Sequence, residues 1–251
     1  MNALVFAAGL GTRLRPWTLE HPKALVSLGG EPMLGRVLRK LAASGLFDRV
    51  VVNVHHFSAQ VVEYLSATDF GIPVEVSDES DLLLDTGGGL VRAIGLLGGP
   101  GEPVLVHNAD IFTDFPLAEM ATAHTDTEAD VTLLAARRDS SRQLLFDATG
   151  RMNGWTNLRT GETLPAGLDP SALDQRAFGG VHILGSRAQQ TLVDYARRLG
   201  PAPVPFGITP FYIASCAELD IRAFAPAAEY RWFDIGSPEK LADAEKSLEI
   251  Q

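Results

Sequence analysis

The sequence predicts an α/β protein with a mostly parallel, Rossmann-like central sheet flanked by helices. Short runs of β-branched and aliphatic residues alternate with segments whose apolar residues recur at helical spacing. Strands that alternate with helices form βαβ units, which build a parallel sheet. Two polar segments, a glycine-rich loop and the turn at residues 108–110, follow expected strands. Because open α/β sheets bind ligands beyond the carboxyl ends of their strands, both segments are expected at one site.

The elements expected in the first half follow one another in strict alternation. Apolar residues at helical spacing predict a helix over residues 33–44, which Gly45 ends, and Ser58 is expected to cap the next helix. A third helix is expected over residues 88–97. The expected strands cover residues 4–7, 49–54, 74–76 and 103–108.

The second half has a less regular pattern. The expected strands cover residues 129–136, 144–146, 152–156, 178–184 and 230–234. Helices are expected over residues 188–198 and 238–248, and the proline-rich residues 201–210 are expected to form a surface connection.

Composition and charge exclude several classes of protein. The chain is 46% hydrophobic and 21% charged, as in an ordinary soluble globule. A single cysteine excludes an internal disulfide and suits a reducing compartment, so the expected location is the cytoplasm. A net charge of −10 argues against nucleic acid or an anionic membrane as partner. Neither a signal peptide nor a membrane-spanning run is expected from the sequence.

The glycine-rich loop after the first strand has the composition of a phosphate-binding site. Glycine carries no Cβ, so backbone N–H groups can approach and point at an anion. Arg13 adds a planar guanidinium and Lys23 adds a point charge. The loop lacks the full G-x-G-x-x-G pattern of dinucleotide-binding proteins, because Leu14 stands at the third glycine position. It also lacks the Gly-Lys-Ser/Thr ending of a P-loop. The residues expected to hold phosphate are Ala7, Ala8, Gly9, Gly11, Thr12, Arg13 and Lys23.

Two aspartates are candidate ligands for Mg²⁺. Asp110 and Asp234 each end an apolar strand, where a carboxylate is exposed at the sheet edge. Two carboxylates from distant strands suit this ion, which takes few protein ligands and completes its shell with water and phosphate oxygens. Alternatively, either aspartate acts as a cap or turn residue, and Asp234 is well placed for that beside Gly236.

Three further segments carry a likeness to a known family. They are Asp-Thr-Gly-Gly-Gly at residues 85–89, Asn-Ala-Asp at 108–110 with Asp114 after it, and residues 232–241. With the loop and its Pro22-Lys23, they resemble the sugar-1-phosphate nucleotidyltransferases over nearly the whole chain and in the same order. The resemblance implies a glycosyltransferase-A-like fold with a smaller sugar-binding β lobe. It also implies a Mg²⁺-dependent attack of a sugar phosphate on the α-phosphorus of a nucleoside triphosphate.

The resemblance also implies roles for individual residues and segments. Arg13, Lys23 and Asp110 would be catalytic, and the loop residues above would bind the nucleotide. The base and ribose would lie on Glu79, Thr86, Gly87 and Gly88, and the sugar on Asn108, Asn157 and Gly180. Residues 1–251 would form one domain, with a nucleotide-binding half (1–115), a sugar-binding lobe (116–230) and a C-terminal strand and helix that return to the site (231–251).

Within the family, the segments are most similar to the short N-acetylmuramate-1-phosphate uridylyltransferases, which favours UTP and N-acetylmuramate 1-phosphate as substrates. Mannose-1-phosphate guanylyltransferases come next, and a non-catalytic subunit that senses nucleotide sugars is a further alternative. The chain departs from the family twice. Ala109 replaces a common glycine, and no Glu-Lys-Pro element stands between Val131 and Phe178. The second departure lowers the support for a guanylyltransferase and leaves one cation for the sugar phosphate unassigned.

Overall fold

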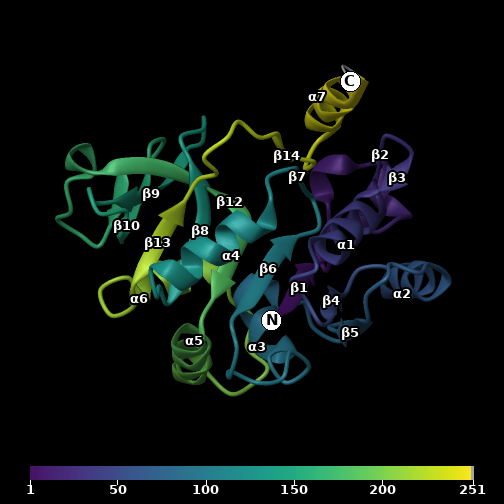
Figure 1. Ribbon diagram of the computed structural model, residues 1–251, viewed down its shortest axis with the longest axis horizontal. Coiled ribbons are helices and arrows are strands. Elements are labelled where there is room, and N and C mark those ends of the chain that lie inside the picture. Colours follow the sequence, from purple (N-terminus) through teal and green to yellow (C-terminus); the bar gives the residue numbers. More distant parts are fainter. Residues whose placement is uncertain (250–251) are drawn as a thin grey trace.

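The computed structural model describes residues 1–249 and forms a mixed sheet with helices on both faces (Figure 1). Residues 250 and 251, at the end of the expected C-terminal segment, lie outside the described residues. Within the described chain, ten strands join in the order β11-β10-β9-β12-β6-β1-β4-β5, with β8 on β12 and β13 on β8. These strands are β1 (Asn2–Phe6), β4 (Val50–Val54), β5 (Val74–Asp78), β6 (Val104–Asn108), β8 (Val131–Ala136), β9 (Arg142–Phe146), β10 (Met152–Asn157), β11 (Glu162–Leu164), β12 (Asp174–Leu184) and β13 (Ile221–Phe224).

The parallel part of the sheet is the one that the sequence predicts. Strand β1 pairs in parallel with both β4 and β6, and β4 pairs in parallel with β5. On the other side of β6 the sheet continues through β12, which is antiparallel to β6, β8 and β9. The α/β fold class is therefore confirmed, with a parallel first half and a largely antiparallel second half.

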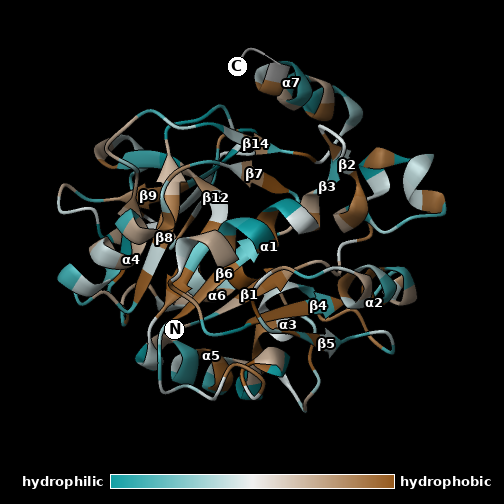
Figure 2. Ribbon diagram, turned by 45° about the vertical axis from the view of Figure 1, so that its right-hand side comes forward, coloured by the Kyte–Doolittle hydropathy of each residue, from teal (hydrophilic) through white to brown (hydrophobic). Residues whose placement is uncertain are grey.

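Helices cover the two faces of the sheet in two separate hydrophobic cores. One core contains α1, α2 and α4 with Val5 and Val52, and the other contains α3, α5 and α6 with Leu4 and Val51. Neighbouring strand residues thus enter opposite cores, as the two-residue period of a strand requires. Apolar colour concentrates on the central strands in Figure 2. The helices are α1 (Met33–Ser44), α2 (Ser58–Ala67), α3 (Asp85–Ala93), α4 (Leu117–Asp126), α5 (Ser186–Leu199), α6 (Ile208–Ser215) and α7 (Pro238–Glu249).

A third, smaller core joins the end of the chain to its beginning. Ile235 and Ala244 pack with Leu14, Leu28 and other residues of the first 33. Two small sheets accompany this core, β2 (Ser27–Leu28) with β3 (Glu31–Pro32), and β7 (Ile111–Thr113) with β14 (Trp232–Asp234). Figure 1 shows the yellow helix α7 beside the purple β2 and β3. Segments far apart in sequence therefore meet beside the carboxyl end of β6.

Several elements differ from those expected. Helix α1 has the predicted bounds, but α3 begins three residues before the expected start and ends at Ala93. The sequence analysis missed α4, β2, β3, β7, β11 and β13, and it assigned the start of α6 to a surface connection. Helix α6 tolerates Pro210 because this proline lies in the first turn, where its missing N–H has no helical acceptor to lose. No helix formed by residues 1–249 has the length and apolar character needed to cross a membrane.

Burial lowers the pKa of His182 in strand β12 from 6.5 to about 3. Neither of its ring nitrogens has a hydrogen-bond partner in the described chain. The imidazole of the unfolded chain therefore takes up a proton first as the pH falls below 6.5. For one such histidine this costs the fold about 2 kcal/mol at pH 5. We expect His182→Phe to flatten the fall of the free energy of unfolding between pH 7 and pH 5.

Urea unfolding at several pH values measures this effect, with the exposed His21→Gln as the matched control. If wild type and His182→Phe lose stability in parallel as the pH falls, His182 is not the source of the acid sensitivity.

Candidate active site

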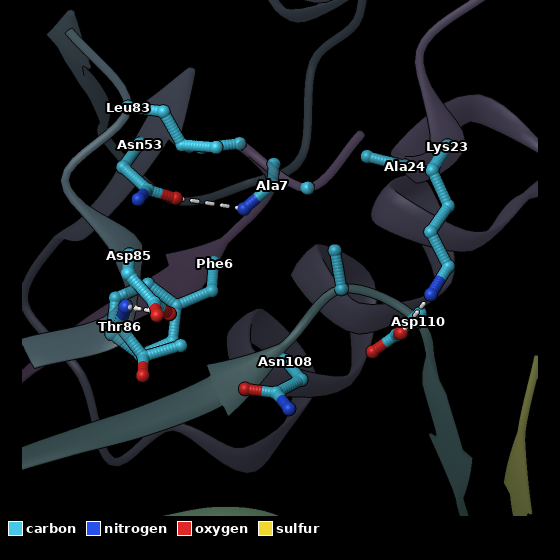
Figure 3. Close-up of a pocket in the computed structure, with 13 residues that line it drawn as sticks. Phe6, Ala7, Lys23, Ala24, Asn53, Leu83, Asp85, Thr86, Asn108 and Asp110 are labelled. Carbon is cyan, nitrogen blue, oxygen red and sulfur yellow. Dashed lines mark hydrogen bonds and ion pairs between the residues drawn. The ribbon is translucent and has the colours of Figure 1, made fainter. Parts of the chain in front are cut away.

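A cleft of about 300 Å³ lies at the carboxyl ends of β1 and β6 (Figure 3). In Figure 3, Lys23 reaches Asp110 at one end of the cleft, while Asp85 and Thr86 lie at the other. Asn108 lies between these two groups in the same view. The residues that line the cleft are Phe6, Ala7, Ala8, Gly9, Lys23, Ala24, Asn53, Leu83, Asp85, Thr86, Asn108, Ala109 and Asp110.

The glycine-rich loop lies along this cleft, close to the backbone of the segment that carries Lys23. Gly11 has a left-handed φ of 62°, and a Cβ there would lie 2.8 Å from Lys23 Cβ and 2.9 Å from Thr18 Cγ2. The Thr18 hydroxyl donates to the Gly11 carbonyl at 2.8 Å. Glycine is thus required at position 11 by its conformation and by the close approach of Lys23. Gly9 has open space around it, so its backbone is free to approach a ligand.

A buried polar chain fixes the start of this loop. The Ala7 N–H donates to Asn53 Oδ1 at 2.8 Å, and Asn53 Nδ2 donates to Glu79 Oε1 at 2.8 Å. The other Glu79 oxygen accepts the Leu84 N–H at 3.2 Å. Burial raises the pKa of Glu79, although the Asn53 and Leu84 hydrogen bonds oppose that shift. The chain joins β1, β4 and the segment before α3 into one rigid unit.

Two expectations from the sequence are corrected by this chain of hydrogen bonds. The Glu79 side chain is 0% exposed, so the expectation that it contacts the base is wrong in this structure. The Ala7 amide donates to Asn53 and is not available to an anion. Sequence analysis missed Asn53, although an asparagine within a run of buried valines was a visible signal.

The glycines after Thr86 also have a different role from the one expected. Gly87 and Gly88 are buried, and both of their amides donate to the Phe206 carbonyl, at 2.8 and 3.2 Å. A Cβ on Gly87 would collide with the Phe206 ring. These glycines let the segment before α6 approach α3, so they do not form a surface for the base. Thr86 does line the cleft, and so does Asp85, whose left-handed φ of 58° was not foreseen.

An ion pair lies at the end of the cleft that we call the phosphate end, because Lys23 is expected from the sequence to hold phosphate there. Asp110 directly follows β6 in the loop that leads into β7, and its carboxylate accepts a hydrogen bond from Lys23 Nζ. The side chains are 13% exposed for Lys23 and 23% for Asp110, so the pair is shielded from solvent but still reachable from the cleft. Lys23 follows Pro22 in a short 3-10 turn that directs its side chain across to the end of β6.

Asp234 lies beside the segment that carries Asp110, although it comes from the far end of the chain. Strand β14 pairs with β7, Asp234 lies opposite Ile111, and the Ile235 N–H donates to the Asp110 carbonyl at 2.8 Å. Lys240 Nζ donates to Asp234 Oδ2 at 2.7 Å, and Arg13 Nη2 lies 3.9 Å from the same oxygen. Two acids that are more than a hundred residues apart in sequence are therefore neighbours, each beside a cation. Lys240 is a member of this group that the sequence analysis had not assigned.

The donor set at this end suits Mg²⁺. Among residues 1–249 no group of three or more histidine, cysteine or acidic side chains is arranged to hold a metal. Asp110, just before β7, and Asp234, the last residue of β14, offer carboxylate oxygens from segments that pair with each other. Mg²⁺ binds through one or two carboxylates when water and substrate phosphates supply its other ligands. The two aspartates thus fit an ion that arrives with a phosphate substrate.

Of the residues expected to bind a sugar, Asn108 lines the cleft, and Gly180 lies against the Asn108 side chain. Gly180 has a φ of 73°, and a Cβ there would lie 2.9 Å from Asn108 Nδ2 and 2.8 Å from Ile111 Cγ1. Gly180 is buried at a register shift of β12, where it permits the irregular pairing and the close approach of Asn108.

Asn157 lines a second cavity of about 760 Å³, over β9, β10 and β11. Two structural connections link the linings of the two cavities. The Ile208 N–H donates to Thr86 Oγ1 at 2.9 Å, and Thr209 lines the second cavity. Strand β12 contains both Gly180, which lies beside Asn108, and Phe178, which lines the second cavity. The linings of the two cavities are thus joined through β12 and the start of α6.

Comparison with known proteins identifies the class to which this fold and site belong. Residues 2–146 match the family model described as Nucleotidyl transferase, and the chain belongs to that family. It is 32% identical over 253 residues to the N-acetylmuramate alpha-1-phosphate uridylyltransferase of Caulobacter vibrioides, which covers 98% of this chain and 96% of the relative. The family predicted from the sequence is confirmed, and the chain is a nucleotidyltransferase.

Other relatives match over less of their length or at lower identity. Mannose-1-phosphate guanylyltransferase 1 of Arabidopsis thaliana is 31% identical over 187 residues, and this chain spans 52% of its length. The crystal structure of HddC from Yersinia pseudotuberculosis has a TM-score of 0.75 at 20% identity and covers 98% of this chain and 99% of its own. A UDP-glucose pyrophosphorylase structure has a TM-score of 0.76 at 15% identity and covers 99% and 98%. At these identities the two structures support the fold alone.

The loop geometry predicts a measurable role for Asn53. Replacing it with alanine leaves the buried Glu79 carboxylate and the Ala7 N–H without their partner. We expect Asn53→Ala to lower the free energy of unfolding by about 2 kcal/mol, because unsatisfied buried groups are costly. We also expect a several-fold rise in KM for the nucleoside triphosphate, because the loop start is no longer fixed.

The matched control is Asn2→Ala, which removes a hydrogen bond to the Leu97 carbonyl away from the cleft. Denaturant unfolding and steady-state kinetics should separate the two variants, with KM altered only in the first. An unchanged KM in Asn53→Ala would mean that the loop holds its conformation without this brace.

Proposed function

We propose that this nucleotidyltransferase transfers a nucleoside monophosphate from a nucleoside triphosphate to a sugar 1-phosphate, releasing pyrophosphate. The observation that carries the proposal is that two ion-paired carboxylates lie on neighbouring segments, and that one of them, Asp110, lines the end of a cleft that also contains Gly9. Asp110 and Asp234 reach this point from strands that pair with each other. A cleft that offers cations, free backbone and paired acids suits two phosphate-bearing substrates.

The reaction requires positioning and charge neutralisation rather than covalent chemistry on the protein. An oxygen of the sugar phosphate forms a bond to the α-phosphorus, and the bond from that phosphorus to the oxygen of the β-phosphate breaks. The electron pair of the broken bond leaves with pyrophosphate. In this proposal Arg13 and the loop amides hold the β- and γ-phosphates, and Lys23 holds the α-phosphate or the incoming sugar phosphate. Each cation lowers the repulsion between the two anions as they approach.

In the same proposal Asp110 and Asp234 hold a Mg²⁺ ion. When bound, the ion supplies positive charge to the phosphate oxygens and stabilises the charge of the transition state. Lys23 and Lys240 now pair with these two carboxylates. Lys23 and Lys240 would be free to donate to phosphate oxygens if a cation neutralised their carboxylate partners. The ion pairs thus keep the side chains extended into the cleft before substrate binds.

For the particular substrates we propose UTP and N-acetylmuramate 1-phosphate. The support is the similarity to the Caulobacter vibrioides uridylyltransferase, which extends over almost the full length of both chains. GTP with mannose 1-phosphate is a second candidate, supported by a guanylyltransferase of which this chain spans about half. Similarity over both substrate regions favours the first pair.

A panel of four nucleoside triphosphates and several sugar 1-phosphates tests the function through release of pyrophosphate. We expect turnover with Mg²⁺, highest for UTP with N-acetylmuramate 1-phosphate. Exchange of labelled pyrophosphate into the triphosphate in the presence of the nucleotide sugar gives an independent measurement. If triphosphate binds but no pair is turned over or exchanged, the chain acts as a nucleotide-sensing subunit instead.

Asp110→Asn tests the ligand assignment at the phosphate end. The substitution keeps the shape but removes the charge that attracts Lys23 and a metal ion. We expect kcat to fall by about 10²- to 10³-fold, as for the loss of one group that stabilises transition-state charge. The melting temperature should fall only modestly, because both side chains remain partly exposed and water can reach the uncompensated Lys23.

The control is Asp78→Asn, an aspartate at the carboxyl end of β5 that lies outside the cleft. Activity should persist in this variant. Wild-type activity of Asp110→Asn with the same Mg²⁺ requirement would remove Asp110 from the proposed metal site.

A further inference from the structure

The second cavity has a floor made by two rows of side chains across three antiparallel strands. Residues that pair directly across an antiparallel ladder lie on the same face of the sheet. Leu144, Trp155 and Leu164 pair in this way and form an apolar row. Arg142, Asn157 and Glu162 pair next to them and form a polar row. All six residues line the cavity of about 760 Å³. An aromatic ring beside hydrogen-bonding groups suits a sugar ring, which has apolar faces and a polar edge.

Arg142 is the cation of this floor, and its guanidinium has no hydrogen bond or ion pair with any residue of the described chain. Its neighbours in sequence differ. Arg137 pairs with Asp174 at 2.9 Å, and Arg138 donates to the Ala177 carbonyl at 2.9 Å and stacks on Trp232. Arg142 therefore has a complete set of five donors to offer a ligand.

The backbone that presents Arg142 is held in place. The Arg142 N–H donates to the Ser140 hydroxyl at 3.2 Å, and this hydroxyl donates to the Arg142 carbonyl at 3.1 Å. Buried Gln143 donates to the carbonyls of Ser140 and Arg138, at 2.9 and 3.1 Å. The start of β9 is thus fixed before a ligand arrives, which lowers the entropy lost on binding.

Strand order sets the position of Arg142 relative to the phosphate end. The order β11-β10-β9-β12-β6 makes β9 the strand of the three closest to the cleft beyond β6. Arg142 is therefore the inner member of its row, and Glu162 on β11 is the outer one. Arg142 is not among the residues that line the first cleft, which contains Gly9 of the glycine-rich loop and the Lys23–Asp110 pair. A sugar whose phosphate lies at Asp110 would extend toward Arg142 across β12.

We infer that the cavity over β9–β11 binds the sugar of the acceptor and that Arg142 selects acceptors whose sugar carries a carboxylate. This inference rests on the function proposed above. The Arg142 fork binds the carboxylate through two charge-assisted hydrogen bonds, Trp155 packs on the sugar, and Asn157 donates through Nδ2, since its Oδ1 already accepts the Arg159 N–H at 3.1 Å. When the acceptor has no carboxylate, the Arg142 guanidinium stays hydrated and adds no binding free energy for that acceptor.

The test compares two acceptors that differ in this group, N-acetylmuramate 1-phosphate and N-acetylglucosamine 1-phosphate, each with UTP. The measured quantity is the ratio of their kcat/KM values. We expect Arg142→Gln to lower this ratio by about 10- to 100-fold, through a higher KM for the acidic acceptor alone. Arg142→Lys should keep part of the preference, because it retains the charge but not the fork. Arg159→Gln, which removes a nearby arginine outside the cavity, should leave the ratio unchanged.

Two results would overturn the inference while leaving the proposed function intact. Equal losses for both acceptors in Arg142→Gln would mean that Arg142 binds the phosphate that they share. An unchanged ratio would mean that the carboxylate is bound elsewhere or not at all. If the wild type turned over no sugar 1-phosphate, the proposed function itself would fail, and this inference would fail with it.

Discussion

The pairing of β14 with β7 is the constraint on which the rest of the site depends. This pairing joins Asp234 to the segment that follows Asp110, although more than a hundred residues of sequence, including β8 to β13, lie between the two aspartates. The third hydrophobic core holds this arrangement, because Ile235 and Ala244 bury apolar surface against residues of the first 33. Without that burial, two three-residue strands would have too few hydrogen bonds to stay paired. The charged end of the cleft is thus held by apolar contacts behind it.

A protein with a net charge of −10 can bind polyanions here because its charges at the cleft are paired locally. Lys23 neutralises Asp110, and Lys240 with Arg13 neutralises Asp234, so an approaching phosphate meets no excess of negative charge. The first pair is shielded from solvent, which strengthens the coupling between its partners. Removing one partner would leave the other as an uncompensated charge. Lys23 and Asp110 therefore depend on each other in the free enzyme as much as in the reaction.

The sequence predicted the parallel half of the fold well, because each element there is long enough to show its period. Helix α1 was predicted to the residue, and β1, β4, β5 and β6 to within a residue or two at most ends. The strands that were missed, β2, β3, β7, β11 and β13, have two to four residues, too few to show a period. Helix α4 carries only two large apolar residues, Leu117 and Met120, on its buried side.

Prediction of the site failed where one residue type serves two physical needs. Close packing against Phe206 and close approach of a ligand both require a residue without a Cβ, so the sequence could not distinguish them at Gly87. Glu79 is a similar case, because a carboxylate that binds a ligand and one that braces a buried asparagine look alike in sequence. Asp110 and Asp234 were predicted from their positions at the ends of apolar strands and, more strongly, from the family resemblance, and the structure places them on neighbouring segments.

The first cleft and the second cavity have separate linings, on strands that lie on either side of β12. In the proposed function, the sugar that is recognised could therefore change while the phosphate chemistry stays the same. The register shift at Gly180 lets this strand pair with β6 beside the phosphate end and with β9 beside the second cavity. Side chains on β9, β10 and β11 make no part of the first cleft, and those of the glycine-rich loop make no part of the second cavity. Substitutions on the antiparallel strands can therefore alter which groups of a sugar are recognised while the ion pairs that hold phosphate stay in place. The selectivity proposed for Arg142 on β9 would follow from this separation, because Arg142 lines the second cavity and not the cleft that contains Lys23 and Asp110.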